Sequence, residues 1–411
     1  MITEITTYKN AFVPMIWMGE QGYPEGSNGG RCYITGLLGM LKHLGVEDVA
    51  FADGASGDGF SFRWTPAWGA AAFNGGAGPF HDIWEYMCSV MGFNCHWVED
   101  PIGGEEAAFK QLLSLIQRGI PVQVSAHYNK ILSYGAESSP RLARSNKVLP
   151  KTGFGHHFVV TGYDLEENTV SLWEPNDLPE YANYKCPIDV FKKGWLEAAQ
   201  RRNNKYEPWP YHFPWGGEWT LHDGYGPYLM VWIEKERDPN WNIWQAIYNS
   251  FYRNIKILKG DYPKPYALSG NQWQIPYWET GAPGMKRFAE RIIAGEIKDT
   301  LLPDGTYVPL FVRGNIPNHG VLGRKSASDY LNIVARELDE KHSDSSKVAG
   351  AAESMQRSSD IFRELRYEEN LSKAGVILKN IAEQELLALE QMEAAWPTIR
   401  GVYESKKSEM N

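Results

Sequence analysis

Apolar residues recur every three or four positions near the start of the chain. Between residues 32 and 45 (CYITGLLGMLKHLG) they occupy positions 34, 37, 38, 41 and 44, which predicts an amphipathic helix. Gly45 is suited to ending this helix, and Lys42 and His43 in its last turn suit the helix dipole. Cys32 therefore stands at or just before a helix start. Segments 80–93 and 105–119 are also predicted to be helical.

A different pattern predicts strands further along. Residues 120–128 alternate and are rich in β-branched side chains, and 226–235 form a second short apolar run. Residues 156–175 are predicted to be a hairpin with a tight polar turn at 166–168. Paired positions in this hairpin should have numbers that sum to about 333. Glu174 should then lie opposite Val159, about one pair from His157.

The remaining segments define the expected architecture. Residues 50–80 are rich in glycine and aromatic residues and are predicted to be a flexible loop. The GASGDG piece lacks the GK[ST] ending of a phosphate-binding loop. Beyond about residue 238 helical patterns dominate, with a Pro/Gly-rich loop expected at 261–284. The predicted fold class is α+β, with an α+β domain at 1–237 and a mainly helical domain at 238–411.

Composition narrows the classes of partner and location. The 411 residues are 43% hydrophobic and carry a formal net charge of -9, and no basic stripe stands out. A nucleic-acid partner is therefore not expected. The N-terminus lacks a signal-peptide pattern, and no apolar run approaches the roughly 18 residues that span a bilayer. We expect a cytoplasmic protein with no membrane association.

Four cysteines occur without a CxxC pair or zinc-site spacing, so we expect free thiols. Cys32 differs from the others because a helix N-terminus favours its thiolate, although a lone cysteine there is often only a small buried residue. A rigid, strand-borne His157 could act as its base, with Glu174 to orient the ring. His156 is the rival, since adjacent strand residues face opposite ways. The same argument opposes a two-histidine metal site, and no metal is predicted.

These features together resemble a known family. A Gly-x-Cys at a helix start, the strand HHFVVTGYD about 125 residues later, and a following acidic residue with proline resemble C39-type papain-like enzymes. The resemblance is closer to the butirosin acyltransferase-like family. It is supported by GGRCYITGLLGMLKHLG, GDGFSFRW, GIPVQVSAHYNKILSY and the helical C-terminal region, so it covers most of the chain.

The resemblance implies a function as well as a fold. Members of that family move an acyl group from a carrier-protein phosphopantetheine thioester to an amine. By position, Cys32 would be the nucleophile, His157 the base and Glu174 the orienting acid. No cofactor of the protein's own is implied. The implied partners are an acyl or peptidyl carrier protein and a small amine or amino acid, in specialised-metabolite (antibiotic) biosynthesis.

The chain departs from the family pattern at two places. The orienting acid is commonly Asp before proline, where this chain has Glu174, and an oxyanion Gln commonly stands six residues before the cysteine, where this chain has Gly26. Gln21 or Asn28 are the candidates to replace that donor, aided by backbone N–H groups at the helix start.

Three further questions stay open at the level of sequence. The same residues would serve a cysteine peptidase or amidase with water as acceptor, and a non-catalytic binding scaffold is the alternative from another class. A carrier protein is usually acidic, so its docking would require a basic patch, for which Arg201–Arg202 or Lys192–Lys193 are candidates. The long C-terminal helices could supply a homodimer interface.

Overall fold

The computed structural model describes most of the chain in two compact units. The described residues are 9–13, 31–65, 70–72, 80–127, 131, 155–174, 183–200, 227–261, 279–297, 300–301, 307–308, 316–338, 342, 344–365, 368 and 370–410. Unit 1 comprises Met1–Glu47, Phe93–His212 and Gly216–Arg237, and unit 2 comprises Asp48–Gly92, Phe213–Trp215 and Asp238–Asn411.

The division differs from the predicted domains in two segments, the long segment 48–92 and the three residues 213–215. The sequence interpretation placed all of 1–237 in one domain, whereas residues 48–92 group with the C-terminal helices. The chain therefore leaves unit 1 after the first helix and returns to it at Phe93. Unit 2 is discontinuous as a result.

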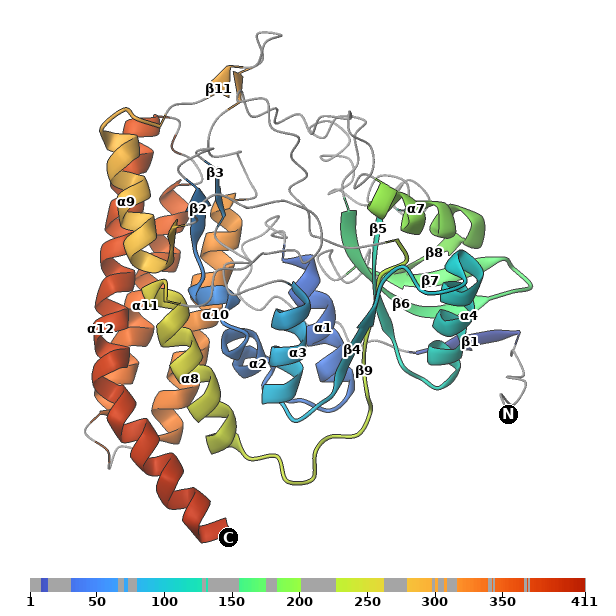
Figure 1. Ribbon diagram of the computed structural model, residues 1–411, viewed down its shortest axis with the longest axis horizontal. Coiled ribbons are helices and arrows are strands. Elements are labelled where there is room, and N and C mark those ends of the chain that lie inside the picture. Colours follow the sequence, from blue (N-terminus) through green and yellow to red (C-terminus); the bar gives the residue numbers. More distant parts are fainter. Residues whose placement is uncertain are drawn as a thin grey trace. The chain divides into compact units, whose positions relative to one another are not determined.

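Unit 1 is built on an antiparallel sheet, to which the described residues contribute seven strands (Figure 1). Six of them follow the order β4-β9-β5-β6-β7-β8, and β1 pairs with β6 beyond the stretch that β5 covers. The strands are β1 Asn10–Phe12, β4 Cys95–Val98, β5 Val122–His127, β6 Gly155–Asp164, β7 Thr169–Trp173, β8 Asn183–Pro187 and β9 Met230–Ile233. The helices of unit 1 within the described residues are α1 Cys32–His43, α4 Gly104–Gln117 and α7 Ile188–Gln200.

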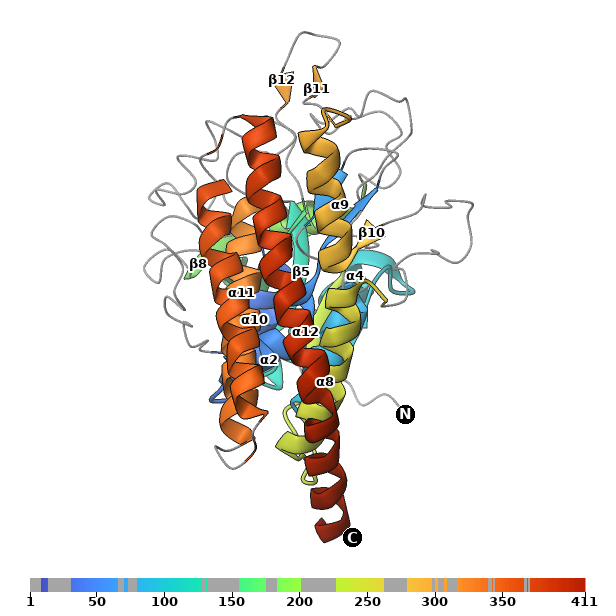
Figure 2. The ribbon, with the colours of Figure 1, turned by 90° about the vertical axis from the view of Figure 1, so that its left-hand side faces the viewer.

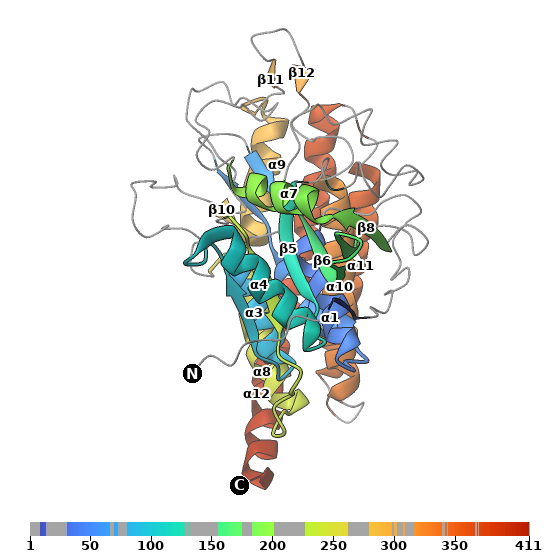
Figure 3. The ribbon, with the colours of Figure 1, turned by 90° about the vertical axis from the view of Figure 1, so that its right-hand side faces the viewer.

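Alternating side chains divide the sheet into two faces. Val124 and Phe158, which are paired across β5 and β6, join a core with Leu112 of α4 and Trp195 of α7. Figure 3 shows α4 and α7 lying over these strands. The opposite face carries Gln123 and Val159, which lie against α1. Helices thus cover both faces of the sheet: α4 and α7 lie on one face, and α1 lies on the other.

The contact between α1 and the sheet depends on one glycine. A Cβ added at Gly36 would come within 2.1 Å of Oε1 of Gln123 and 3.2 Å of Cγ2 of Val159. Gln123 also donates from Nε2 to the carbonyl oxygen of Tyr33, at 3.2 Å. Gly36 therefore allows α1 to approach the sheet closely, and Gln123 fixes the first turn of that helix.

The hairpin β6–β7 contains a bulge. Near the turn the pairs Asp164–Thr169 and Gly162–Ser171 follow the predicted register, with numbers that sum to 333. Between Val160 and Gly162 the register shifts, and the next pairs are Val160–Leu172 and Val159–Trp173. The extra residue in β6 is Thr161. A bulge of this kind moves every later residue of β7 by one position along its partner.

Unit 2 is mainly helical. Its helices are α2 Val49–Ala55, α3 Phe80–Val90, α8 Ile243–Lys259, α9 Gly281–Ile293, α10 Ile316–Glu337, α11 Ser345–Leu365 and α12 Leu371–Met410, with a short 3-10 turn η1 at Asp58–Phe60. Helix α10 packs on α11, α11 on α12, and α12 on α8 and α9 (Figure 2). Two small antiparallel sheets complete the unit: β10-β2-β3 (Glu279–Thr280, Arg63–Thr65, Ala70–Ala72) and β11-β12 (Thr300–Leu301, Tyr307–Val308).

The prediction of a flexible loop at 50–80 was wrong for its first part. Residues 51–62 are all buried, and they form α2, η1 and the approach to β2. Their glycines serve close packing: a Cβ at Gly54 would meet the side chain of Tyr330, and one at Gly59 would meet the carbonyl oxygen of Gly323. Glycine content here reflects helix contacts and does not indicate mobility.

The helices and strands predicted elsewhere are confirmed where they are described. They correspond to α1, α3, α4, β5, β6, β7 and β9, and to α8–α12 in the C-terminal half. The proposed loop at 261–284 lies largely outside the described residues. Among the described helices, none combines the length and apolar character needed to cross a bilayer.

Candidate active site

Cys32 is the first residue of α1, as the sequence predicts. Arg31 precedes the helix, and its carbonyl oxygen accepts hydrogen bonds from the backbone N–H groups of Ile34 (2.9 Å) and Thr35 (3.0 Å). No side chain among the described residues caps this helix start. The sulfur therefore stands at the positive end of the helix dipole. Cys32 is 8% exposed.

His156 joins Cys32 to Glu174. Its Nε2–H donates to Oε2 of Glu174 at 2.7 Å, and both side chains are almost fully buried. The same ring is also hydrogen-bonded to the side chain of Cys32, which contributes to its raised pKa. A thiol, an imidazole and a carboxylate thus form one continuous hydrogen-bonded chain within unit 1. This is the order of groups in nucleophile–base–orienter sites.

The charges of this group favour an imidazolium. Burial by itself lowers the pKa of His156, but the negative charges of Cys32 and Glu174 and their hydrogen bonds outweigh it and raise the pKa to about 10. The site is therefore a buried imidazolium that lies between the side chains of Cys32 and Glu174.

The histidine that the contacts join to Cys32 and Glu174 is His156, and not the predicted base His157. His157 lies on the α1 face of β6 with Val159, and its ring meets the edge of Tyr33 at a centroid distance of 6.4 Å. Burial and the positive charge of His156 lower the pKa of His157 to about 3, so its ring is neutral at pH 7. A group of such low basicity is poorly suited to accept a proton from a thiol or an amine.

The bulge at Thr161 explains why Glu174 meets His156 and not His157. In the unbroken register Glu174 would lie opposite Val159, on the face of His157. The shift by one residue places it level with Phe158 instead, on the face of His156. The signal for this was present in the sequence, because an isolated glycine inside a strand pattern, here Gly162, is typical of a bulge. Glu174 itself was predicted to orient the histidine, and it lies in hydrogen-bond contact with His156.

The oxyanion candidates Gln21 and Asn28 lie outside the described residues. Of the other cysteines, Cys88 is buried, and burial raises the pKa of Cys186 to about 12, which keeps that thiol protonated. Within the described residues, no group of three histidine, cysteine or acidic side chains has an arrangement that could hold a metal ion.

Comparison with known families points in the same direction as the geometry. Residues 75–202 match the sequence model of the Peptidase_C39 like family. This segment is similar to C39-type cysteine enzymes. It contains both His156 and Glu174, and it begins after Cys32. A search among curated proteins gave no significant match. The family match and the buried Cys–His–Glu chain together indicate a cysteine-enzyme fold.

Proposed function

We propose that this protein is a papain-like cysteine acyltransferase that moves an acyl group from a carrier-bound phosphopantetheine thioester to an amine. The observation that carries the proposal is the buried hydrogen-bonded chain of Cys32, His156 and Glu174. The donor and acceptor classes follow the resemblance to the butirosin acyltransferase-like family. The protein needs no cofactor of its own in this scheme, because the pantetheine belongs to the partner.

The first half-reaction acylates Cys32. Its thiolate attacks the thioester carbonyl carbon and a new C–S bond forms, while the bond to the pantetheine sulfur breaks. The departing sulfur takes the proton of the His156 imidazolium and leaves as a thiol. One thioester replaces another, so little free energy is lost. Backbone N–H groups at the start of α1 are suited to stabilise the negative oxygen of the tetrahedral intermediate.

The second half-reaction forms the amide. The amine nitrogen attacks the acyl carbon on Cys32, the neutral imidazole of His156 accepts a proton from it, and the Cys32 thiolate leaves. Glu174 stabilises the imidazolium that results, as the third group does in related catalytic sites. The thiolate–imidazolium pair is thereby restored, with protons and charges balanced over the cycle.

Burial of the site supports transfer over hydrolysis. Cys32 is 8% exposed, His156 3% and Glu174 1%. An acyl-enzyme held in such surroundings meets little bulk water, which gives a bound amine the advantage.

A hydrolase is the second candidate, and one observation favours it. The family that residues 75–202 match is named for peptidases. A peptidase or amidase would use the same three residues, with water in the place of the amine. The two functions differ only in what discharges the acyl group from Cys32.

Carrier docking needs a basic surface, for which the sequence offers two pairs of residues. Arg201 and Arg202 lie outside the described residues. Lys192 is already engaged, because it pairs with Glu105 at 3.1 Å and lies over the ring of Phe109. Of the proposed pair only Lys193 has an exposed side chain with no salt bridge among the described residues.

Intact-mass measurement with an acyl-pantetheine tests the proposal. We expect a mass gain equal to the acyl group in the native protein and none in Cys32→Ala. An added amine should then discharge the acyl group faster than buffer alone. Equal discharge in buffer would establish the hydrolase. No gain with any thioester, in a protein whose Cys32 reacts rapidly with iodoacetamide, would refute thioester chemistry, and an unreactive Cys32 would favour the non-catalytic scaffold.

A further inference from the structure

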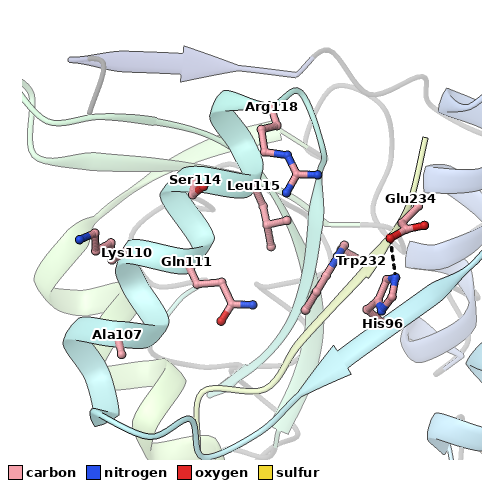
Figure 4. Close-up of a pocket in the computed structure, with 9 residues that line it drawn as sticks. All are labelled: His96, Ala107, Lys110, Gln111, Ser114, Leu115, Arg118, Trp232 and Glu234. Carbon is pink, nitrogen blue, oxygen red and sulfur yellow. Dashed lines mark hydrogen bonds and ion pairs between the residues drawn. The ribbon is translucent and has the colours of Figure 1, made fainter. Parts of the chain in front are cut away.

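A groove in unit 1 lies apart from the catalytic group. It runs between α4 and the strand pair β4–β9 and has a volume of about 500 Å³. None of Cys32, His156 and Glu174 lines it. The volume falls in the range of sites for small organic ligands, about 300–1,000 Å³. Figure 4 shows its lining side chains.

One wall of the groove is aromatic. The ring of Trp232, which is partly exposed, stacks on that of His96 with a centroid distance of 5.4 Å and an interplanar angle of 21°. In Figure 4 Trp232 lies between His96 and the side chains of α4. A flat π surface on the wall of a small groove favours a planar ring, which can stack on it.

The opposite wall of the groove is formed by α4 and is mainly polar. Gln111, Ser114 and Arg118 succeed one another at helical spacing along α4 and line the groove with Leu115. In Figure 4 the side chain of Gln111 extends towards Trp232, and Arg118 stands at the end of the groove nearest the C-terminus of α4. A guanidinium with an amide donor is a typical carboxylate-binding pair.

The charges in the groove select a ligand of single negative charge. Hydrogen bonds from Asn94 and then His96 (2.9 Å) lower the pKa of Glu234, which also feels the charge of Arg118, so this carboxylate is ionised. The guanidinium of Arg118 is exposed and makes no salt bridge among the described residues. Lys110, the other cation of the lining, points away from Trp232 in Figure 4. One available cation beside one fixed anion favours a monoanion over a polyanion.

We propose that this groove binds a small aromatic monocarboxylate, with its ring on Trp232 and its carboxylate on Arg118. Gln111 and Ser114 supply additional hydrogen bonds to polar substituents. This inference does not depend on the proposed catalysis, since the groove contains none of the catalytic residues. It predicts that the affinity of a ligand depends both on its negative charge and on its aromatic ring.

Calorimetric titration of the full-length protein with three probes tests this site. Indole-3-carboxylate should bind saturably, and indole-3-carboxamide, which has the same ring without the charge, at least about tenfold more weakly. Adenosine monophosphate, a planar dianion, should also bind more weakly. Absence of saturable binding by the carboxylate, or equal binding of the carboxamide, would overturn the proposal. Tighter binding of the nucleotide would overturn it in favour of a nucleotide site.

Variants then locate the site. Arg118→Gln should weaken carboxylate binding by about tenfold or more, as expected for a charge-assisted hydrogen bond, and Trp232→Leu should weaken both indole probes. Lys193→Gln is the matched control, because it removes one exposed positive charge of unit 1 outside the groove, and it should leave the affinities for both indole probes unchanged. Thermal unfolding checks that each variant is folded. Undiminished binding in a folded Arg118→Gln protein would exclude this groove.

Discussion

At the scale of single residues, two adjacent histidines have opposite electrostatic surroundings. His156 lies between two negative groups and holds a proton, whereas His157 is buried beside that positive charge and holds none. The two imidazoles are chemically identical, but they lie on opposite faces of β6. Their roles can therefore be separated by substituting one at a time.

We expect His156→Gln to slow alkylation of Cys32 by iodoacetamide at pH 7 by roughly tenfold or more, because the imidazolium that holds the thiolate is lost. His157→Gln should leave the rate within about twofold. Peptide mapping of the alkylated protein gives the rate at Cys32 alone. If His157→Gln slowed the alkylation and His156→Gln did not, His157 would be the partner of Cys32.

The stability of the protein should fall in mild acid because of His157. Its folded pKa of about 3 lies below the unfolded value of 6.5, so the unfolded chain binds an extra proton as the pH falls below 6.5. At pH 5 this costs about 2 kcal/mol relative to pH 7. His156 behaves differently: its raised pKa gives stability that is complete below 6.5 and is lost as pH rises through about 10.

Urea unfolding at pH 7 and pH 5 measures the effect. His157→Gln should show a smaller loss of unfolding free energy between the two pH values than the native protein, by about 2 kcal/mol. If the variant and the native protein show the same pH dependence, the imidazole of His157 must gain a proton in the folded native protein as readily as in the unfolded chain.

At the scale of elements, the position of Cys32 depends on how closely α1 approaches β5 and β6. Gly36→Ala places a methyl group against Gln123 and should destabilise the protein by about 1–3 kcal/mol, as overpacking does, and slow alkylation of Cys32. Adding Gln123→Ala should recover part of both losses by removing the obstructing amide. Gly401→Ala is the control, since nothing lies within 4 Å of a Cβ there. It should be neutral, or stabilising by up to about 1 kcal/mol.

Urea unfolding and the alkylation assay serve for these variants too. A Gly36→Ala protein as stable and as reactive as the native one would show that α1 has room to move away from the sheet. Two single losses that simply add in the double variant would contradict the proposed contact between positions 36 and 123.

Elements with strong local signals were predictable, and their three-dimensional relations were less so. The periodicity from Ile34 to Leu44 and the turn at 166–168 were sufficient to predict α1 and the β6–β7 hairpin. The bulge at Thr161 was not predicted, and that one residue decides which histidine meets Glu174. The burial of 51–62 was missed because its glycines are required by helices more than 200 residues away in sequence, as Gly59 is by Gly323.

At the scale of the whole molecule, unit 2 unites distant parts of the chain. Phe51 and Phe60 pack on Tyr330, with centroid distances of 5.3 and 6.1 Å, and Phe62 packs on Phe288 at 5.9 Å. Arg324, which is buried and paired with Glu385 at 2.7 Å, also donates to the carbonyl oxygen of Ser61 at 3.0 Å. Segment 48–62 is therefore part of the core of the helical unit.

A chain cut after Arg237 should consequently fail to give a well-folded protein, even though the cut follows the domain boundary expected from sequence. Phe51, Phe60 and Phe62 are at most 1% exposed in the full chain and would be left without their partners. We expect aggregation on size-exclusion chromatography. Co-expression with residues 238–411 should restore a soluble complex. A monodisperse fragment 1–237 with a cooperative thermal transition would contradict this.

Because unit 2 is discontinuous, its two parts are synthesised at different times. A ribosome adds about 5–20 residues per second, so on the order of tens of seconds pass between the synthesis of Phe51 and that of Tyr330. During that interval Phe51, Phe60 and Phe62 lack their packing partners, because the helices that carry those partners have not yet been synthesised. The nascent chain is thus a candidate client for a ribosome-associated chaperone, and its yield should depend on how fast the second half is translated.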